Sequence, residues 1–178
     1  MTLAPARAAA RAIARRRGTR DPFRICREEG ITVMARNDFK RQKGAFTVVA
    51  GERFIFINGL LSEEMQRIVC AHELGHAVLH RREGRNVFPE FDLFSASSGR
   101  LEGEANAFAA ELLLDGEEIL QLAREGMDAA QIARATRSHV NLVILKMEGM
   151  NARGGGFRLP RGVRSGFLLN AADDAGEV

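Results

Sequence analysis

A short stretch with three evenly spaced histidines, HELGHAVLH, occupies residues 72–80. On a helix, residues four apart lie on one face and about 6 Å apart along the axis, so His72 and His76 can direct one ring nitrogen each at a common point. Glu73 lies about 100° around the helix, where it can reach a water molecule held at that point. This H-E-x-x-H pattern is typical of sites in which two imidazoles bind zinc and the glutamate acts as general base.

The alternative is that these polar residues belong to an ordinary amphipathic helix. They interrupt an otherwise apolar run, IVCAHELGHAVL, in which two imidazoles and a carboxyl would be costly to bury without partners. A metal site is therefore the stronger interpretation. His80 needs its own explanation, because it stands about 12 Å along the axis from His72 and cannot share a tetrahedral ion with it. We expect His80 to lie beside the site, in a pocket or at the helix end.

A third ligand must come from another segment, because a catalytic zinc usually has three protein ligands and one open position. The predicted helix LEGEANAFAAELLL offers three acids. Glu102 and Asn106 share a face, so Glu102 could bind the metal while Asn106 hydrogen-bonds a ligand histidine and fixes its tautomer. Glu104 points about 200° away and is the second candidate, and Glu111, farther along, is more simply a surface charge. The expected site residues are His72, His76 and Glu102 as metal ligands and Glu73 as the base.

The elements before the histidines predict how they are positioned. ITVMAR, AFTVVA and RFIFIN are rich in β-branched and aromatic residues, and Gly51-Glu52 can form a tight turn between the last two. We expect a small, three-stranded, mainly antiparallel sheet, of which RFIFIN could also pair with an extended substrate. Ser62 can cap the histidine-bearing helix. Gly75 in mid-helix costs about 1 kcal/mol relative to alanine, which predicts close packing there.

Six arginines and no acidic residue lie within residues 1–20. A transit peptide, a nucleic-acid-binding arm and an amphipathic helix can all have this composition. We favour the helix, because the alanines favour it and Gly18 supplies a stop. The next segment, DPFRICREEG, places Asp21 as a cap and Pro22 at the first helical position, so it predicts a second, short helix.

The C-terminal half predicts further helices, after a loop at residues 81–100 of a length that is usually functional or mobile. Residues 128–150 resemble a helix-turn-helix, a unit that can place a helix in the DNA major groove. Its second helix offers Asn141, Lys146 and Glu148 among mainly apolar residues, a poor surface for reading bases. A lobe that packs on the core or grips a partner is therefore favoured over direct nucleic-acid binding. The expected organisation is a core at 1–115, a helical, helix-turn-helix-like lobe at 116–150 and a flexible Gly/Arg-rich tail at 151–178.

Composition supports an α+β globular protein. Of the 178 residues, 46% are hydrophobic and 28% are charged, as in domains with a sizeable core. No apolar run approaches the roughly 20 residues of a membrane helix. Cys26 and Cys70 lie far apart without a C-x-x-C pattern, which indicates neither a disulfide framework nor a cysteine zinc site. A reducing, cytoplasmic location is the simpler expectation.

Three segments closely resemble the ImmA/IrrE family of zinc metallopeptidases: RDPFRICREEGITV, RFIFINGLLSEEMQRIVCAHELGHAVLH and LEGEANAFAAELLLDGEEIL. The resemblance spans roughly residues 15–150. It implies a thermolysin-like core in which His72, His76 and Glu102 bind Zn²⁺, with Mn²⁺ as an alternative, and Glu73 is the base. Many members have proline after the leucines of the last segment, where this chain has Asp115.

The resemblance also implies a substrate, namely a helix-turn-helix transcriptional repressor of phage or stress-response type, whose cleavage derepresses its genes. The rival interpretations are a DNA- or protein-binding regulator and an antitoxin-like partner with a metal site but no proteolysis; the presence of Glu73 weighs against the latter. Peptide hydrolysis further needs a donor for the oxyanion. The chain has no tyrosine, which leaves His80, His139 and arginines of the 81–100 loop as candidates.

Overall fold

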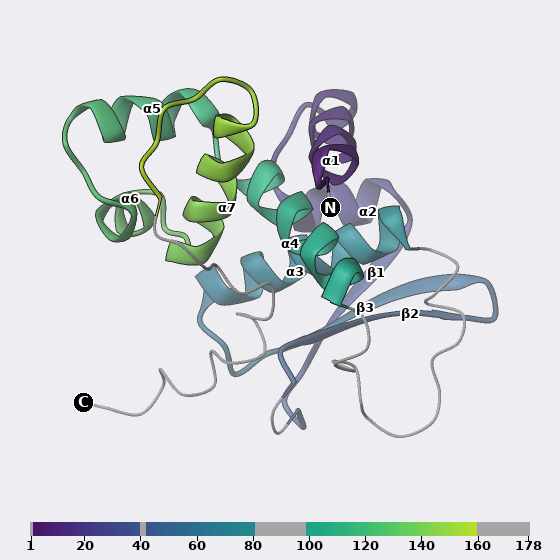
Figure 1. Cartoon of the computed structure of the whole chain (residues 1–178). Helices are drawn as coiled ribbons and strands as arrows, with labels where there is room; N and C mark the ends of the chain where they lie inside the picture. Colours follow the sequence, from purple (N-terminus) through teal and green to yellow (C-terminus); the bar gives the residue numbers. More distant parts are fainter. Residues whose placement is uncertain (1, 40–41, 81–98, 160–178) are drawn as a thin grey trace.

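The computed structural model describes residues 2–39, 42–80 and 99–159. Figure 1 shows the helices gathered above a small sheet. The helices are α1 (Ala4–Arg17), α2 (Pro22–Glu28), α3 (Glu63–Leu79), α4 (Gly99–Leu113), α5 (Gly116–Arg124), α6 (Ala129–Ala135) and α7 (Val140–Asn151), and the strands are β1 (Ile31–Arg36), β2 (Gly44–Val49) and β3 (Glu52–Asn58). The α+β class is confirmed. Most of the predicted 81–100 loop and the end of the predicted tail lie outside the described residues, and within them no helix is long and apolar enough to cross a membrane.

The sheet has the order β1-β3-β2, with β3 in the centre. β3 pairs with β2 in antiparallel fashion and with β1 in parallel, so the sheet is mixed where the sequence predicted it to be mainly antiparallel. The antiparallel pair is a local hairpin, in which Ala50 and Gly51 both have positive φ between the paired residues Val49 and Glu52. The parallel pair joins strands separated along the chain, and a strand pattern carries no information about such pairing. The prediction that RFIFIN pairs with substrate is wrong, because both edges of β3 are occupied.

Helix α3 lies against β2, β3 and α4. It begins as predicted, with the Ser62 hydroxyl accepting a hydrogen bond from the Met65 amide. Gly75 faces α4, where a Cβ atom would lie 3.1 Å from the Ala105 Cα. The predicted close packing at Gly75 is therefore confirmed, and it brings the backbones of α3 and α4 together.

The Arg-rich N-terminus forms α1, as predicted, and ends at Gly18 with positive φ. Its arginines stabilise the helical core. Arg7 is buried and donates a hydrogen bond to the Leu145 carbonyl of α7, and Arg20, just beyond α1, donates to carbonyls at the end of α4 and pairs with Asp115. Asp115 also caps α5, which gives a structural role to the aspartate that replaces the common proline.

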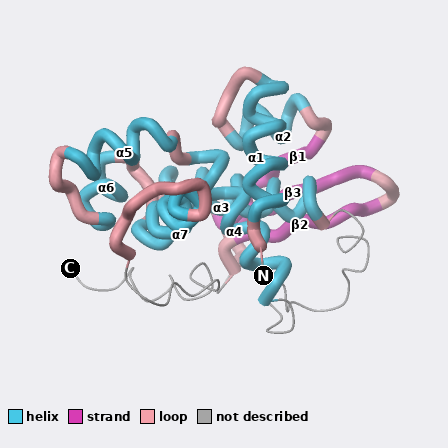
Figure 2. The backbone as a smooth tube through the Cα atoms, turned by 45° about the horizontal axis from the view of Figure 1, so that its top comes forward, coloured by secondary structure: helices cyan, strands magenta, loops and turns pink. Residues whose placement is uncertain are grey.

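Helix α7 corresponds to the supposed recognition helix, and it is a core helix. Leu142 to Met147 are all buried, including the Lys146 side chain. Figure 2 shows α7 lying between the α5–α6 pair and the rest of the molecule, and it packs on α4 and α6. A helix buried in this way has no free face for the major groove, so the described residues give no support to direct DNA reading by this unit.

Glu111 is buried in α4, which corrects its interpretation as a surface charge. Its Oε1 atom lies 3.1 Å from Lys146 Nζ on α7 and 3.0 Å from Arg11 on α1, and both Glu111 and Lys146 are only 3% exposed. Burial lowers the pKa of Lys146 while Glu111 opposes that shift. The two ion pairs of Glu111 therefore join α1, α4 and α7.

Glu111→Ala should destabilise the protein by about 3 kcal/mol, because it leaves the Lys146 charge buried without its carboxylate. Denaturant unfolding measures the change. Glu118→Ala, at an exposed position on α5, is the control and should change stability by less than about 0.5 kcal/mol. Equal, small effects of the two substitutions would contradict the role given to the buried pair.

Candidate metal centre

Side chains from α3 and α4 converge at one point. The Nε2 atoms of His72 and His76 lie 3.1 Å apart, and the two Glu102 carboxylate oxygens lie 3.1 Å from His72 Nε2 and 3.3 Å from His76 Nε2. Ligand atoms bound at 2.0–2.1 Å to one tetrahedral ion are about 3.3 Å apart. The three donors therefore have the spacing of a single metal site, and no other group of three such side chains occurs in the described part of the chain.

Helix α4 places Glu102 and Asn106 as predicted. The Asn106 Oδ1 atom lies 2.8 Å from His72 Nδ1, and both side chains are buried. An amide oxygen can only accept, so His72 carries its proton on Nδ1 and leaves the Nε2 lone pair for a metal. Burial alone would raise the pKa of Glu102, but the close contacts with His72 and His76 hold it well below its ordinary value. Glu102 is thus a carboxylate aimed at both imidazoles.

Glu104, the other candidate ligand, contacts His80. Its Oε2 atom lies 2.8 Å from His80 Nε2, and the other His80 nitrogen lies 3.1 Å from His76 Nδ1. His80 ends α3 as its C-cap residue, so it lies beside the site, as one of the predicted alternatives had it. Because both of its nitrogens are engaged, His80 has no donor to offer an oxyanion. His139 is the N-cap of α7, and the arginines of residues 81–98 lie outside the described structure.

Glu73 is buried next to the three donors. Its side chain extends from α3 toward Gly44 of the edge strand β2. Burial raises its pKa to about 7; the neighbouring His76 lowers it, Glu102 raises it, and a hydrogen bond from the Phe46 amide lowers it. Such a carboxyl changes protonation near neutral pH, as a general base or acid must. The sequence could not show that β2 supports this residue.

Gly44 of β2 leaves room for Glu73. A Cβ atom at position 44 would lie 3.1 Å from Glu73 Oε1 and would overlap with the Val69 side chain. Gly44→Ala should therefore displace Glu73 and slow any reaction that depends on it by about 10- to 100-fold while the three metal donors stay in place, since a misplacement near 1 Å has effects of that size. Kinetics and metal content measure the two effects. Gly156→Ala, where a Cβ meets no atom within 4 Å, is the control; an equally active Gly44→Ala protein would contradict the role given to β2.

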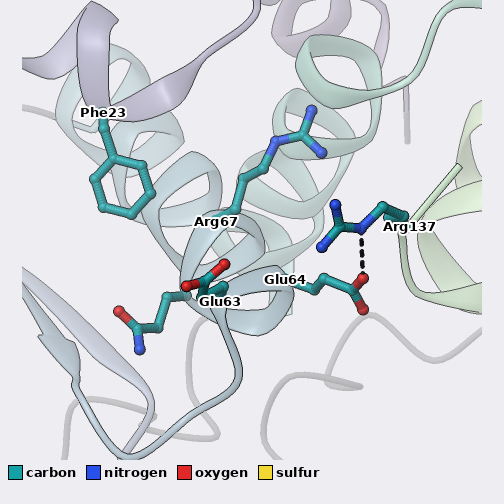
Figure 3. A pocket seen from close by; sticks show the side chains of 6 residues that line it. Phe23, Glu63, Glu64, Arg67 and Arg137 are labelled. Carbon is teal, nitrogen blue, oxygen red and sulfur yellow. Dashed lines mark hydrogen bonds and ion pairs between the residues drawn. The ribbon is translucent and has the colours of Figure 1, made fainter.

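The described residues also form a pocket of about 400 Å³ at the start of α3, lined by Phe23, Glu63, Glu64, Gln66, Arg67 and Arg137. Figure 3 shows Arg137 directed at Glu64 on one side of the pocket, and the two side chains pair at 2.8 Å. Glu64 precedes His72 by eight residues, or about 12 Å of helix. The pocket is therefore separate from the candidate metal centre.

Cys26 of α2 and Cys70 of α3 come together in the core, which the sequence did not predict. Their sulfur atoms are 3.9 Å apart, both residues are fully buried, and both thiols are free. The hydrogen bond between them and their burial raise the pKa of Cys70, and a thiol of raised pKa is a poor nucleophile and metal ligand. The pair therefore belongs to the hydrophobic core and not to the candidate metal centre.

Comparison with known proteins agrees with this geometry. The family model of a peptidase family described as the IrrE N-terminal-like domain matches residues 26–163. The chain is 34% identical over 108 residues to the uncharacterised immunity region protein 2 of Bacillus phage phi105, covering 61% of this chain and 67% of that protein. It is 33% identical over 99 residues to metallopeptidase ImmA of Bacillus subtilis strain 168, covering 54% of this chain and 56% of that enzyme. The chain thus spans little more than half of the enzyme's length.

Proposed function

The chain belongs to the peptidase family described as the IrrE N-terminal-like domain, and on that premise we propose that it is a zinc-dependent metalloendopeptidase. The observation that carries the proposal is the convergence of His72, His76 and Glu102 with the buried carboxyl of Glu73 beside them. The three donors would hold the metal, and Glu73 would be the general base. The four proposed site residues all belong to the core at 1–115. The lobe at 116–150 packs on this core, where Lys146 pairs with Glu111.

The donor set fits the proposed ion. Two neutral imidazoles and one carboxylate suit Zn²⁺, and Mn²⁺ can also bind such a set, with lower intrinsic affinity. A bound ion of this kind lowers the pKa of its water and polarises a peptide carbonyl. Glu73 then has the two proton transfers to perform, taking the proton from the attacking water and delivering it to the leaving amine. Its pKa of about 7 in the metal-free chain suits a group that must both accept and release a proton.

No described strand pairs with the outer edge of β2, and this edge is the proposed binding surface for an extended substrate. Val49 and Glu52 pair across the hairpin turn, so by alternation the main-chain groups of Gly44, Phe46 and Val48 face away from β3. The Phe46 amide at this edge is the one that contacts Glu73. A segment paired along the edge would lie beside the base, held by main-chain hydrogen bonds that demand no single sequence.

We propose a helix-turn-helix transcriptional repressor as the substrate, cleaved in the cytoplasm to derepress its genes. The support is that one relative is named for a phage immunity region and another is named metallopeptidase ImmA. The experiment is incubation of the zinc-loaded protein with the repressor encoded beside it, followed by mass spectrometry, with casein as an unrelated substrate.

One cut in the repressor, and none in casein, is the expected result. Intact repressor after incubation with zinc- or manganese-loaded protein would contradict repressor cleavage and favour a partner that binds metal without proteolysis. Cleavage of casein and repressor at many sites would contradict the narrow substrate while leaving the peptidase in place.

A further inference from the structure

A row of three side chains leads away from the candidate metal centre. His76 Nδ1 lies 3.1 Å from His80 Nδ1, and His80 Nε2 lies 2.8 Å from Glu104 Oε2. His80 is 5% exposed and Glu104 21%. The His80 position is also fixed by its backbone, because its amide donates to the His76 carbonyl at 2.8 Å. The row therefore links the last turn of α3 to α4.

The Glu104 carboxylate at the end of this row determines where the ring protons of His80 and His76 lie. The Glu104 carboxylate can only accept, so His80 donates from Nε2, and a neutral His80 is then left with a bare Nδ1. That bare nitrogen accepts a hydrogen bond from His76 Nδ1–H, so the neutral His76 has a bare Nε2 directed at His72 and Glu102. The opposite assignment would put a proton on His76 Nε2 and close it to a metal. Among the neutral forms, one arrangement satisfies both contacts of His80, and it is the one that leaves His76 Nε2 free to bind a metal.

We propose that His80 and Glu104 are positioning residues that fix His76 as a metal ligand. The inference rests on the proposed metallopeptidase function and deepens it. His72 is oriented by the neutral amide of Asn106, whereas His76 is oriented by a histidine that is itself bonded to a carboxylate. A carboxylate behind a ligand imidazole raises its basicity and metal affinity, and loss of such an outer partner typically costs about 10- to 100-fold in affinity.

The test measures zinc affinity by chelator competition, so it does not depend on activity. His80→Ala should weaken zinc binding by about 10- to 100-fold. His80→Asn should restore most of it, because the Asn Oδ1 atom can accept at the place of the lost Nδ1 atom. Glu104→Ala should also weaken binding, and Glu104→Gln, which keeps an acceptor for His80, should weaken it less. Arg100→Ala is the control: Arg100 is 68% exposed and touches Glu104 only at 3.4 Å, so its Kd should match the wild type.

The outcomes separate a failure of the proposed function from a failure of the inference about His80 and Glu104. A wild-type protein that binds no zinc would refute the proposed function and the inference with it. Wild-type binding with an unchanged Kd in His80→Ala would refute the inference alone. An equal loss in His80→Ala and His80→Asn would also refute it, because the acceptor retained by Asn would then make no difference to zinc binding. If circular dichroism shows that His80→Ala is unfolded, the Glu104 pair decides in the same way.

Discussion

Glu73→Gln should slow peptide-bond cleavage by about 10²- to 10⁴-fold while the protein still binds zinc, because the substitution removes the group that moves both protons and none of the three candidate ligands. The side-chain amide of Gln has the size of the carboxyl that it replaces. Its oxygen can still accept a hydrogen bond from the backbone N–H of Phe46. Turnover of the proposed repressor substrate and metal content per chain are the two measurements. Activity near the wild-type level would show that another group is the base.

The same variant offers a control on folding. The pKa of Glu73 lies at about 7 in the metal-free fold against an ordinary 4.5, so the folded state binds the extra proton between these values. The cost of ionising the buried carboxyl therefore grows as pH rises from about 4.5 to 7, and reaches roughly 3 kcal/mol above that window. Metal-free Glu73→Gln should be more stable than the wild type at pH 8, and indistinguishable from it at pH 4. A lost activity with raised stability cannot be attributed to unfolding.

Glu102→Ala should remove the metal, and with it the activity, because it takes away the one carboxylate among the described residues that lies against both His72 and His76. Three donors become two, and the carboxylate between the two Nε2 atoms is lost. Glu104→Ala is the matched variant, two residues away on the same helix. We expect Glu102→Ala to be purified with far less than one zinc per chain, and to weaken zinc binding by more than the roughly 10- to 100-fold expected of an outer partner.

Metal analysis of both purified variants separates the two glutamates. If Glu104→Ala lost its zinc while Glu102→Ala retained it, the ligand assignment would be wrong.

The stability of the metal-free protein at acid pH also depends on Glu102. The pKa of Glu102 is held below its ordinary value by the two histidines, so the stabilisation from this contact is present above about pH 4.5 and is lost as pH falls through the lowered value.

The site could be predicted from sequence because helix geometry is local. A spacing of four placed His72 and His76 on one face, and the same spacing placed Glu102 and Asn106 together on the next helix. The distances confirm that these four side chains meet. The helix caps at Ser62 and Asp21 followed from equally local rules, and both accept the expected backbone hydrogen bonds.

The missed features depend on contacts between distant segments. The central place of β3, the burial of Glu111 against Lys146 and the contact of Cys26 with Cys70 all join elements far apart in sequence. No spacing rule reports such pairings, and a glutamate that neutralises a buried lysine has the same local pattern as one that faces water. His80 shows both sides of this limit, because geometry excluded it as a ligand but only its contact with Glu104 indicated what it does.

Zinc titration of the metal-free protein tests the central claim most directly. Increasing amounts of zinc are added to a known concentration of chains, and repressor cleavage is followed at each step. The account predicts that the rate rises in proportion to added zinc and reaches its plateau at one ion per chain for the wild type, and that Glu73→Gln binds the same single ion without cleaving. Full activity in the metal-free protein, or a plateau at one ion with equal rates for both proteins, would contradict it.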